Sequence, residues 1–491
     1  MEINIKLNKN FVTQYNKLQR EFGTEMARLN GFDDEQLSYT DFIDNFIDKE
    51  TVADASIDGN SNVSHKDIVS LEHEMSKPHQ KVLAFNKIYY EIQKKYGFHA
   101  ANDWLRREYT GELYLHDANT STFKHYCFAY DLKDLAEKGL YFIEGHNAQP
   151  PKHLITFVDF VKEFISFASC RSSGACGLPN LLPYMYYFWR EDIKDNYVLR
   201  DPEYYAKQSF QRFIYACNQP YVRDGSQSAF TNTSIFDREY YAALFGGSKF
   251  PDGSYMIDDM EPFMEFQKMF LDVLSETRSQ NMSTFPVNSM SLLKVDGKFV
   301  DEDFAKYAID HNRIWGDSNL FIDNDVTSLS NCCRLKNNIQ DLGYFNSIGG
   351  TALKVGSVKV STIYLARIAL DTNSEEEYLE ELRKRVRINL MALDRVRYII
   401  KRNVEKGLLP NFTYELVDFE HLYNTIGFIG CYCTMKKFGY TEVDEFGNTY
   451  YKQEAYDFGE KIFQVMKDEA NKFSEEFKVD YKINREQIPG E

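Results

Sequence analysis

Two adjacent cysteines, Cys332 and Cys333, have the setting in this sequence that most favours thiol chemistry. Arg334 follows them directly, and a polar, glycine-containing segment then runs to Gly350. The next stretch, 355–365, is rich in Val, Thr, Ile and Tyr, which is typical of a β-strand. Thiols before such a loop and strand would lie at the tip of a loop on a rigid scaffold, where reactive groups are commonly placed. Taken alone, however, a free cysteine usually acts as a small buried apolar side chain.

A third cysteine, Cys127, follows a stretch whose alternation predicts a short strand ending at His116 and Asp117. Taken alone, Cys127 favours a core position, and a His–Asp pair at a strand end is more often structural than catalytic. The separation of Cys127 from the Cys332 and Cys333 pair is too long for a local constraint to explain both. The argument for a catalytic role of these cysteines therefore depends on the surrounding sequence as a whole and not on any one cysteine.

The composition is that of a large acidic globular protein. Its 491 residues are 43% hydrophobic and 15% aromatic, enough to bury the core of one large α/β barrel or of about two or three smaller domains. The net charge of −17 disfavours nucleic-acid binding through phosphates. We find no signal peptide and no apolar run long enough to span a bilayer. The 8 cysteines include no CxxC pair, which argues against a disulfide scaffold or a four-cysteine zinc site and favours a reducing, cytoplasmic compartment.

Helical and strand patterns alternate along the chain. Helices are predicted at 11–30, 81–96, 100–108, 154–168, 259–278, 304–315 and 454–472, and strands at 283–287, 317–321 and in the last residues. Ser374 and Glu377 form a capping box that starts a further helix, which Gly407 and Pro410 end. The apolar face of that helix carries Leu379, Leu382, Val386, Leu390, Leu393 and Val396.

The stretch 330–370 resembles the anaerobic (class III) ribonucleotide reductases of the glycyl-radical superfamily. In that family an Asn-Cys-Cys-Arg-Leu-like element forms the tip of a finger loop at the centre of an α/β barrel. The similarity continues through 347–351 (SIGGT), 356–360 (GSVKV) and 367–369 (RIA), and it covers nearly the whole chain. The resemblance implies an α/β fold with a ten-stranded barrel over 51–491 and a finger loop at about 330–357. Residues 1–50 would be a helical extension without the family's ATP cone, whose Lys-Arg-Asp-Gly-like signature does not occur here.

The resemblance also implies a reaction, the reduction of ribonucleoside triphosphates to deoxyribonucleoside triphosphates by thiyl-radical chemistry. A thiyl radical can abstract the 3′-hydrogen of the ribose because S–H and activated C–H bonds are comparable in strength. A barrel interior keeps such a radical from water and oxygen. By resemblance Cys333, directly before Arg334, carries the thiyl, and Cys127 is the thiol that faces it across the ribose. Cys332 is the alternative if the register is shifted by one residue.

Binding residues follow from the same resemblance. The predicted substrate-binding residues are His116, Asp117, Ser228, Thr231, Asn232 and Ser357. The helix predicted at 154–168 is apolar on more than one face, which indicates an interface. By resemblance this is the interface of a homodimer, where an effector nucleotide, ATP or a deoxynucleotide, would bind. The loop after this helix offers backbone N–H groups and one guanidinium suited to a triphosphate. Its predicted effector-binding residues are Arg171, Ser172, Ser173 and Gly174.

Two departures from the family pattern leave the reductant open between formate and a thioredoxin-like protein. Members that use formate often carry an asparagine in the strand after the finger, where this chain has Ser357. The family's Thr-Ile-Asn-Leu string reads Thr-Ile-Tyr-Leu at 362–365.

The family's C-terminal zinc site and radical-bearing glycine loop are not found in this sequence. We therefore expect a barrel that is incomplete at the C-terminus and a split enzyme, and we assign no metal ligand. A small second subunit, separate or joined by splicing in trans, would carry the zinc and the glycyl radical. An iron–sulfur, S-adenosylmethionine-dependent activase would install that radical.

Two other functions stay open at this stage. One is a non-catalytic, nucleotide-binding regulatory protein that kept the effector site, and the other is a glycyl-radical lyase acting on formate or diols. The presence of Cys127, Cys332 and Cys333 favours an enzyme over a regulator. The Asn-Cys-Cys-Arg and Ser-Ile-Gly-Gly strings favour a reductase over a lyase.

Overall fold

The computed structural model describes residues 6–23, 43–44, 47, 68–119, 121–198, 201–222, 227–280, 283–326, 328–331, 335–338 and 353–488. Cys332 and Cys333 lie outside these residues, as does most of the predicted finger loop. Within the described ranges, no helix is long and apolar enough to cross a membrane.

One ten-stranded sheet runs through the molecule and consists of two parallel halves. Strands β2, β3, β6, β7 and β9 are parallel neighbours in one half, and β12, β13 and β16 in the other. The halves meet where β12 pairs antiparallel with β2, and β1 and β8 add antiparallel to β12 and β7. Among the described residues, strands β9 and β16 are not hydrogen-bonded to each other. The bounds are β1 Leu113–Leu115, β2 Phe128–Ala129, β3 Cys176–Leu178, β6 Thr231–Phe236, β7 Val287–Val295, β8 Lys298–Phe299, β9 Ser318–Asp323, β12 Val355–Tyr364, β13 Leu422–Ile429 and β16 Ile483–Gln487.

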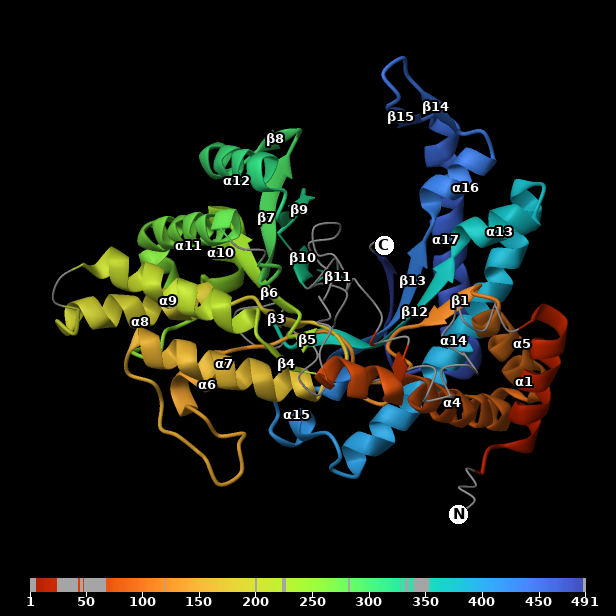
Figure 1. Ribbon diagram of the computed structural model, residues 1–491. Helices are drawn as coiled ribbons and strands as arrows, with labels where there is room; N and C mark the ends of the chain where they lie inside the picture. Colours follow the sequence, from red (N-terminus) through yellow and green to blue (C-terminus); the bar gives the residue numbers. More distant parts are fainter. Residues whose placement is uncertain are drawn as a thin grey trace.

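Helices cover the outer side of both halves (Figure 1). Helices α7 to α11 lie along the β3–β6–β7 half, and α4, α5, α14 and α17 lie along the β12–β13 half. The helix bounds are α1 Lys9–Phe22, α4 Ile68–Tyr96, α5 Phe98–Tyr109, α6 Lys133–Lys138, α7 Leu154–Cys170, α8 Leu181–Lys194, α9 Pro202–Cys217, α10 Arg238–Phe245, α11 Met260–Gln280, α12 Glu302–Trp315, α13 Leu365–Asp371, α14 Glu375–Glu405, α15 Pro410–Thr413, α16 Cys431–Lys437 and α17 Gln453–Phe477, with short 3₁₀ turns η3 Met256–Asp259 and η5 Phe419–His421. The predicted α/β class is confirmed.

Three small two-stranded sheets stand apart from the main sheet: β4 Pro220–Val222 with β5 Gln227–Ser228, β10 Ser328–Asn331 with β11 Leu335–Asn338, and β14 Thr441–Val443 with β15 Thr449–Tyr451. Figure 1 shows β10 and β11 between the two halves of the main sheet. Strand β10 also lies beside β7 and β9.

Helix α14 begins and packs as its sequence predicts. The hydroxyl of Ser374 accepts a hydrogen bond from the backbone N–H of Glu377 at 3.2 Å, and the Glu377 carboxylate accepts one from the backbone N–H of Asn373 at 2.9 Å. These bonds satisfy N–H groups that a helix N-terminus leaves unpaired. The predicted apolar face is buried at Leu382, Val386, Leu390, Leu393 and Val396.

The strand predicted at 283–287 was wrong, because β7 begins only at Val287. The Arg278 guanidinium donates to the backbone carbonyls of Ser283, Thr284 and Pro286 at 3.0, 3.2 and 2.9 Å. These carbonyls are therefore bonded to a side chain rather than to a neighbouring strand. The apolar residues of the segment had suggested a strand, but its backbone hydrogen bonds lead elsewhere.

Helix α1, in the predicted N-terminal extension, is docked on helices α4 and α5. Phe11 is buried and meets the ring of Tyr89 in α4 edge-on, with ring centroids 5.7 Å apart. Tyr15 meets Tyr109 of α5 in the same way at 5.8 Å. The domain boundary expected at residue 50 stays a prediction.

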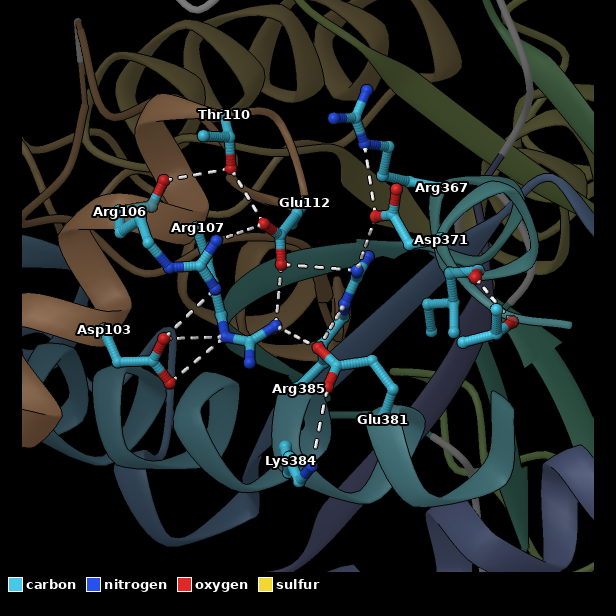
Figure 2. Close-up of polar contacts among 12 residues, drawn as sticks. Asp103, Arg106, Arg107, Thr110, Glu112, Arg367, Asp371, Glu381, Lys384 and Arg385 are labelled. Atoms are coloured by element: carbon cyan, nitrogen blue, oxygen red, sulfur yellow. Dashed lines mark hydrogen bonds and ion pairs between the residues drawn. The ribbon is translucent and has the colours of Figure 1, made fainter. Parts of the chain in front are cut away.

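A buried ion-pair network joins α5, the start of β1 and α14 (Figure 2). Glu112 lies 2.6 Å from Arg106, 2.7 Å from Arg107 and 3.3 Å from Arg385, and Glu381 pairs with both Arg107 and Arg385. Burial alone would raise the pKa of Glu112, but the three guanidinium groups lower it, so the carboxylate stays ionised. The network holds the start of β1 against α14.

We expect Glu112→Gln to lower the free energy of unfolding by about 3 kcal/mol, because two buried guanidinium groups lose the carboxylate that they share. Urea unfolding followed by circular dichroism measures the change. The matched control is Glu380→Gln on α14, whose side chain is 58% exposed. The control should change the free energy by less than about 0.5 kcal/mol. Equal effects of the two substitutions would show that the network contributes nothing beyond a surface pair.

Candidate active site

Cys127 lies where the two halves of the sheet join. The backbone N–H of Ser357 donates to the Cys127 carbonyl at 2.8 Å, and the N–H of Tyr126 donates to the Ser357 carbonyl at 2.9 Å. The first bond extends the antiparallel pairing of Gly356 with Phe128 by one residue, and the second is offset, so Tyr126 and Cys127 both lie opposite Ser357, as at a β-bulge. Cys127 and Ser357 are therefore cross-strand neighbours, and we place their side chains on the same face of the sheet. The structure thus brings together two residues that the sequence analysis had singled out separately.

The Cys127 side chain projects from the face of the sheet that is turned away from the helices. Side chains alternate along a strand, so the neighbouring Phe128, and Cys176 paired with it, point the other way. There Cys176 is fully buried beside Ser169 of α7 and Cys217 of α9, and burial raises the pKa of its thiol. We call the Cys127 side the inner face and the helix-covered side the outer face.

The segment 173–175 packs directly against the thiol of Cys127. The backbone N–H of Ala175 donates to the Cys127 sulfur at 3.2 Å. A Cβ atom at Gly174 would lie 2.6 Å from that sulfur and 2.7 Å from the Cys127 nitrogen. Only glycine can therefore approach the thiol in this way, and the approach aims a backbone N–H at the sulfur.

The hydroxyl of Ser357 is fixed by two neighbours. It donates to the carbonyl of Lys359 at 3.1 Å and lies 2.9 Å from the hydroxyl of Thr425 on β13. Ser357 and Thr425 are both buried. The residue opposite Cys127 is thus held in one orientation by the adjacent parallel strand.

His116 reaches the same region from the end of β1. Its Nε2 lies 2.7 Å from the hydroxyl of Thr362, and its ring centroid is 6.0 Å from that of Tyr126, next to Cys127. Burial, assisted by the charge of Lys359 and opposed by Asp117, lowers the pKa of His116 to about 4. The imidazole is therefore neutral near pH 7. Asp117 itself has a left-handed backbone, with φ of 51°, at the turn that ends the strand.

A buried wall of polar side chains continues the inner face along β6 and β7. The register of β2, β3 and β6 places Asn232 on this face, and its amide donates to the carbonyl of Val287 at 3.0 Å and the hydroxyl of Ser289 at 3.2 Å. Three buried oxygens, Asn232 Oδ1, Ser234 Oγ and Ser291 Oγ, have no hydrogen-bond partner among the described residues. Buried polar atoms normally have partners, so this wall suits a polar ligand or bound water.

Two predicted substrate residues lie elsewhere. Thr231 points to the outer face, where it lies beside the buried thiol of Cys217. Ser228 lies on β5, which pairs with Pro220 of β4 outside the main sheet. The structure does not group these two side chains with Cys127, and their role stays a prediction.

The four predicted effector residues fall into two groups. The Arg171 guanidinium donates to the carbonyl of Phe167 at 2.9 Å and lies 3.9 Å from its ring centroid, at the end of α7. Ser172 and Ser173 are buried, and Gly174 contacts Cys127. The second half of this loop therefore belongs to the surroundings of the thiol, and an effector role stays a prediction for all four residues.

The strands that flank Cys332 and Cys333 in sequence are described, although the cysteines are not. Strands β10 and β11 pair antiparallel, with Asn331 opposite Leu335. The assignment of the thiyl to Cys333 rather than Cys332 stays a prediction. In the described part of the chain, no group of three or more His, Cys, Asp and Glu side chains could hold a metal ion.

Three contributors to this site were missed in the sequence: the N–H of Ala175, the hydroxyl of Thr425 and the side chain of Lys359. A lysine between two valines in a predicted buried strand was a signal that could have identified Lys359, since lysine is rarely buried without a partner. Nothing in the local sequence marks Ala175 or Thr425, because their contacts come from other strands.

We expect Gly174→Ala to lower the free energy of unfolding by about 2 kcal/mol, because the added methyl overlaps the sulfur and backbone of Cys127. The matched control is Gly459→Ala in α17, where a Cβ atom would meet only Met435 Cε at 3.7 Å. That change should be neutral or should stabilise the helix by up to about 1 kcal/mol. Denaturant unfolding of both variants makes the comparison, and a neutral Gly174→Ala would contradict the close packing.

Comparisons with known proteins agree with this geometry. A sequence profile of the family described as anaerobic ribonucleoside-triphosphate reductase matches residues 74–491. The anaerobic ribonucleotide reductase from Thermotoga maritima in complex with dATP and CTP is 34% identical with a TM-score of 0.85, over 99% of this chain and 77% of that chain. The same enzyme with citrate in the active site is 34% identical with a TM-score of 0.84, over 100% of this chain and 85% of that chain.

A further anaerobic ribonucleotide reductase structure is 33% identical with a TM-score of 0.85, over 99% of this chain and 75% of that chain. A search of curated proteins found no match. The profile covers more than half of the chain, and the identity to the solved structures extends over nearly all of it. The chain therefore belongs to the anaerobic ribonucleoside-triphosphate reductase family.

Proposed function

We propose that this chain reduces ribonucleoside triphosphates to deoxyribonucleoside triphosphates, with Cys333 as the hydrogen-abstracting thiyl and Cys127 as the thiol on the other side of the ribose. The observation that carries the proposal is the inner-face setting of Cys127. Its sulfur accepts the Ala175 N–H and lies beside Ser357, in a sheet whose two halves flank β10 and β11. A thiol that transfers a hydrogen atom to a bound substrate must be held in such a fixed position.

The ribose and its substituents would lie against the polar wall of the inner face. Asn232 Oδ1 can accept a hydrogen bond from a ribose hydroxyl, and the hydroxyls of Ser234 and Ser291 can donate or accept one. His116, neutral near pH 7, can likewise donate or accept through its ring. These assignments keep Asn232, His116 and Ser357 as substrate-side residues. Asp117, Ser228 and Thr231 remain candidates from the family resemblance.

A glycyl radical, carried by a small second subunit that also holds zinc, would oxidise the Cys333 thiol to the thiyl. One observation supports a second subunit: among the described strands, β16 pairs only with β13. A strand edge that is free of a neighbour readily accepts another strand. An iron–sulfur, S-adenosylmethionine-dependent activase would install the radical on that subunit.

The proposed enzyme is tested by mixing the chain, the second subunit and the activase anaerobically with S-adenosylmethionine and a ribonucleoside triphosphate. We expect a glycyl-radical signal in electron paramagnetic resonance and a deoxynucleotide product. Parallel reactions with formate and with a thioredoxin system identify the reductant. Cys127→Ser and Cys333→Ala should each lower turnover by at least about 1,000-fold, because each removes a hydrogen-transferring thiol, while nucleotide binding persists. The control Cys433→Ser replaces an exposed cysteine and should retain full activity.

Three outcomes of this experiment would count against parts of the proposal. Radical formation and turnover by the chain with activase alone would exclude a radical-bearing second subunit. Turnover by Cys333→Ala, with loss of activity in Cys332→Ala, would move the thiyl to Cys332. Nucleotide binding without any reduction by the complete mixture would favour the regulatory alternative.

We further propose that effector nucleoside triphosphates bind near the end of α7, across a homodimer interface. Helix α7 carries the partly buried rings of Phe160 and Phe167, and Arg171 follows at its C-terminal end. A related structure, that of the T. maritima enzyme, carries dATP in its specificity site. The Arg171 guanidinium is a suitable partner for a phosphate group.

We expect Arg171→Ala to weaken dATP binding by about tenfold, the loss of one charge-assisted contact. Isothermal titration calorimetry with dATP, dGTP and dTTP measures the affinities. The matched control is Arg313→Ala on α12, an arginine whose side chain is 70% exposed. Unchanged binding in Arg171→Ala would remove Arg171 from the effector site, and a wild-type chain that binds no deoxynucleotide would remove the site altogether.

A further inference from the structure

Lys359 on β12 is fully buried, and its side chain leaves the strand on the face opposite to that of Ser357. Between Ser357 and Lys359 the pairing of β12 with β13 shifts by one residue, from Tyr423 opposite Ser357 to Asn424 opposite Lys359. Adjacent residues of β13 face opposite sides, so Lys359 projects to the outer face while Ser357 projects to the inner face. A charged group so deeply buried is costly to desolvate, and such groups often serve a function.

The contacts of Lys359 converge on the surroundings of Cys127. Its Nζ donates to the hydroxyl of Ser173 and to the backbone carbonyl of Ser121, both at 3.1 Å. The Ser173 hydroxyl and N–H in turn donate to the carbonyl of His125 at 3.1 and 2.8 Å. Lys359 thus joins β12 to the segment that leads into Cys127 and to the loop whose next two residues contact the thiol.

Lys359 contacts the surroundings of Cys127 both through its side chain and through its backbone carbonyl. Through its ammonium group it fixes Ser173, and the chain then places the Ala175 N–H on the sulfur. Through its backbone carbonyl it accepts the hydroxyl of Ser357, the cross-strand neighbour of Cys127. The lysine therefore fixes the loop that covers the thiol and the strand that opposes it.

We propose that Lys359 is a positioning residue for the Cys127 thiol. The inference rests on the proposed reductase function, in which Cys127 must exchange a hydrogen with a bound ribose. The hydrogen bonds of Lys359 lead to the Cys127 sulfur through Ser173 and Ala175. Loss of the ammonium group leaves the 173–175 loop free to drift from the sulfur, and small displacements of a reacting group slow a reaction strongly.

The first test is Lys359→Met, which keeps the length and apolar character of the side chain and removes the charge. In the complete enzyme mixture we expect kcat to fall at least about 20-fold, while KM for the nucleotide changes less than about threefold. The glycyl-radical signal should be unchanged, because Lys359 takes no part in installing it. A KM effect without a kcat effect, or wild-type turnover, would overturn the proposal.

The second test uses the chain without substrate or partner, so it does not depend on the proposed function. Hydrogen–deuterium exchange of a peptide covering 171–178 should accelerate by about tenfold in Lys359→Met, while peptides from α11 keep their wild-type rates. Unchanged exchange would overturn the positioning role even if turnover fell. If the wild-type mixture makes no deoxynucleotide, the reductase function fails, and the exchange result still decides whether Lys359 holds the loop.

Ser173→Ala provides a milder form of the same test if Lys359→Met does not fold. It removes the hydroxyl that the ammonium group contacts, and it should accelerate exchange in the same peptide and lower kcat, each by at least about threefold. The matched control is Ser275→Ala in α11, a buried serine whose hydroxyl has no hydrogen-bond partner among the described residues. Identical exchange and kcat in the two serine variants would overturn the proposal.

Discussion

The antiparallel pairing of β2 with β12 is the constraint on which the rest of the site depends. It is a short ladder, in which Val355 pairs with Ala129 and Gly356 with Phe128. A Cβ atom at Gly356 would overlap the backbone of both Cys127 and Phe128, so the strands can approach this closely only at a glycine. Because this pairing joins a strand early in the chain to one late in the chain, neither half of the sheet forms the thiol site alone.

The two faces of the sheet differ in polarity. Parallel strands that are buried on both sides usually read as continuous apolar runs, and the strands here do not. Strand β6 is buried throughout but has the sequence TNTSIF, and its inner positions are Asn232 and Ser234. The outer face is covered by aromatic and aliphatic side chains of the helices, so apolar burial there offsets polar groups left without partners on the inner face. This asymmetry is what a fold needs in order to enclose a polar substrate.

The elements that sequence predicts well are those whose stability is local. The start of α14 follows from the Ser374 hydroxyl and its buried face from a regular apolar spacing, and both appear as expected. The segment 283–287 failed because a side chain, Arg278, takes up its carbonyls. Arg278 is only five residues from Ser283 in sequence, but its guanidinium also pairs with Asp317, 39 residues away, so the direction of its side chain depends on a distant contact.

In the candidate site, too, the features set by distant contacts are the ones that the local sequence does not predict. The resemblance to a known family identified Cys127 and Ser357, but their contact follows from the pairing of two strands far apart in the chain, which the sequence does not state. The loop at 171–174 has a composition typical of a phosphate-binding turn. In the structure its later residues instead cover the thiol of Cys127, because glycine is the one residue type that fits against the sulfur at position 174. The same glycine is compatible with either role, and only the long-range contact distinguishes them.

A one-residue shift in the pairing of β12 with β13 separates the functions of Ser357 and Lys359. In a regular strand these residues, two apart, would share a face, and the ammonium group would stand among the inner-face polar groups beside Cys127. The shift instead turns Lys359 to the outer face and leaves its carbonyl as the acceptor for the Ser357 hydroxyl. One irregularity in a single strand therefore lets the same residue fix both neighbours of the thiol.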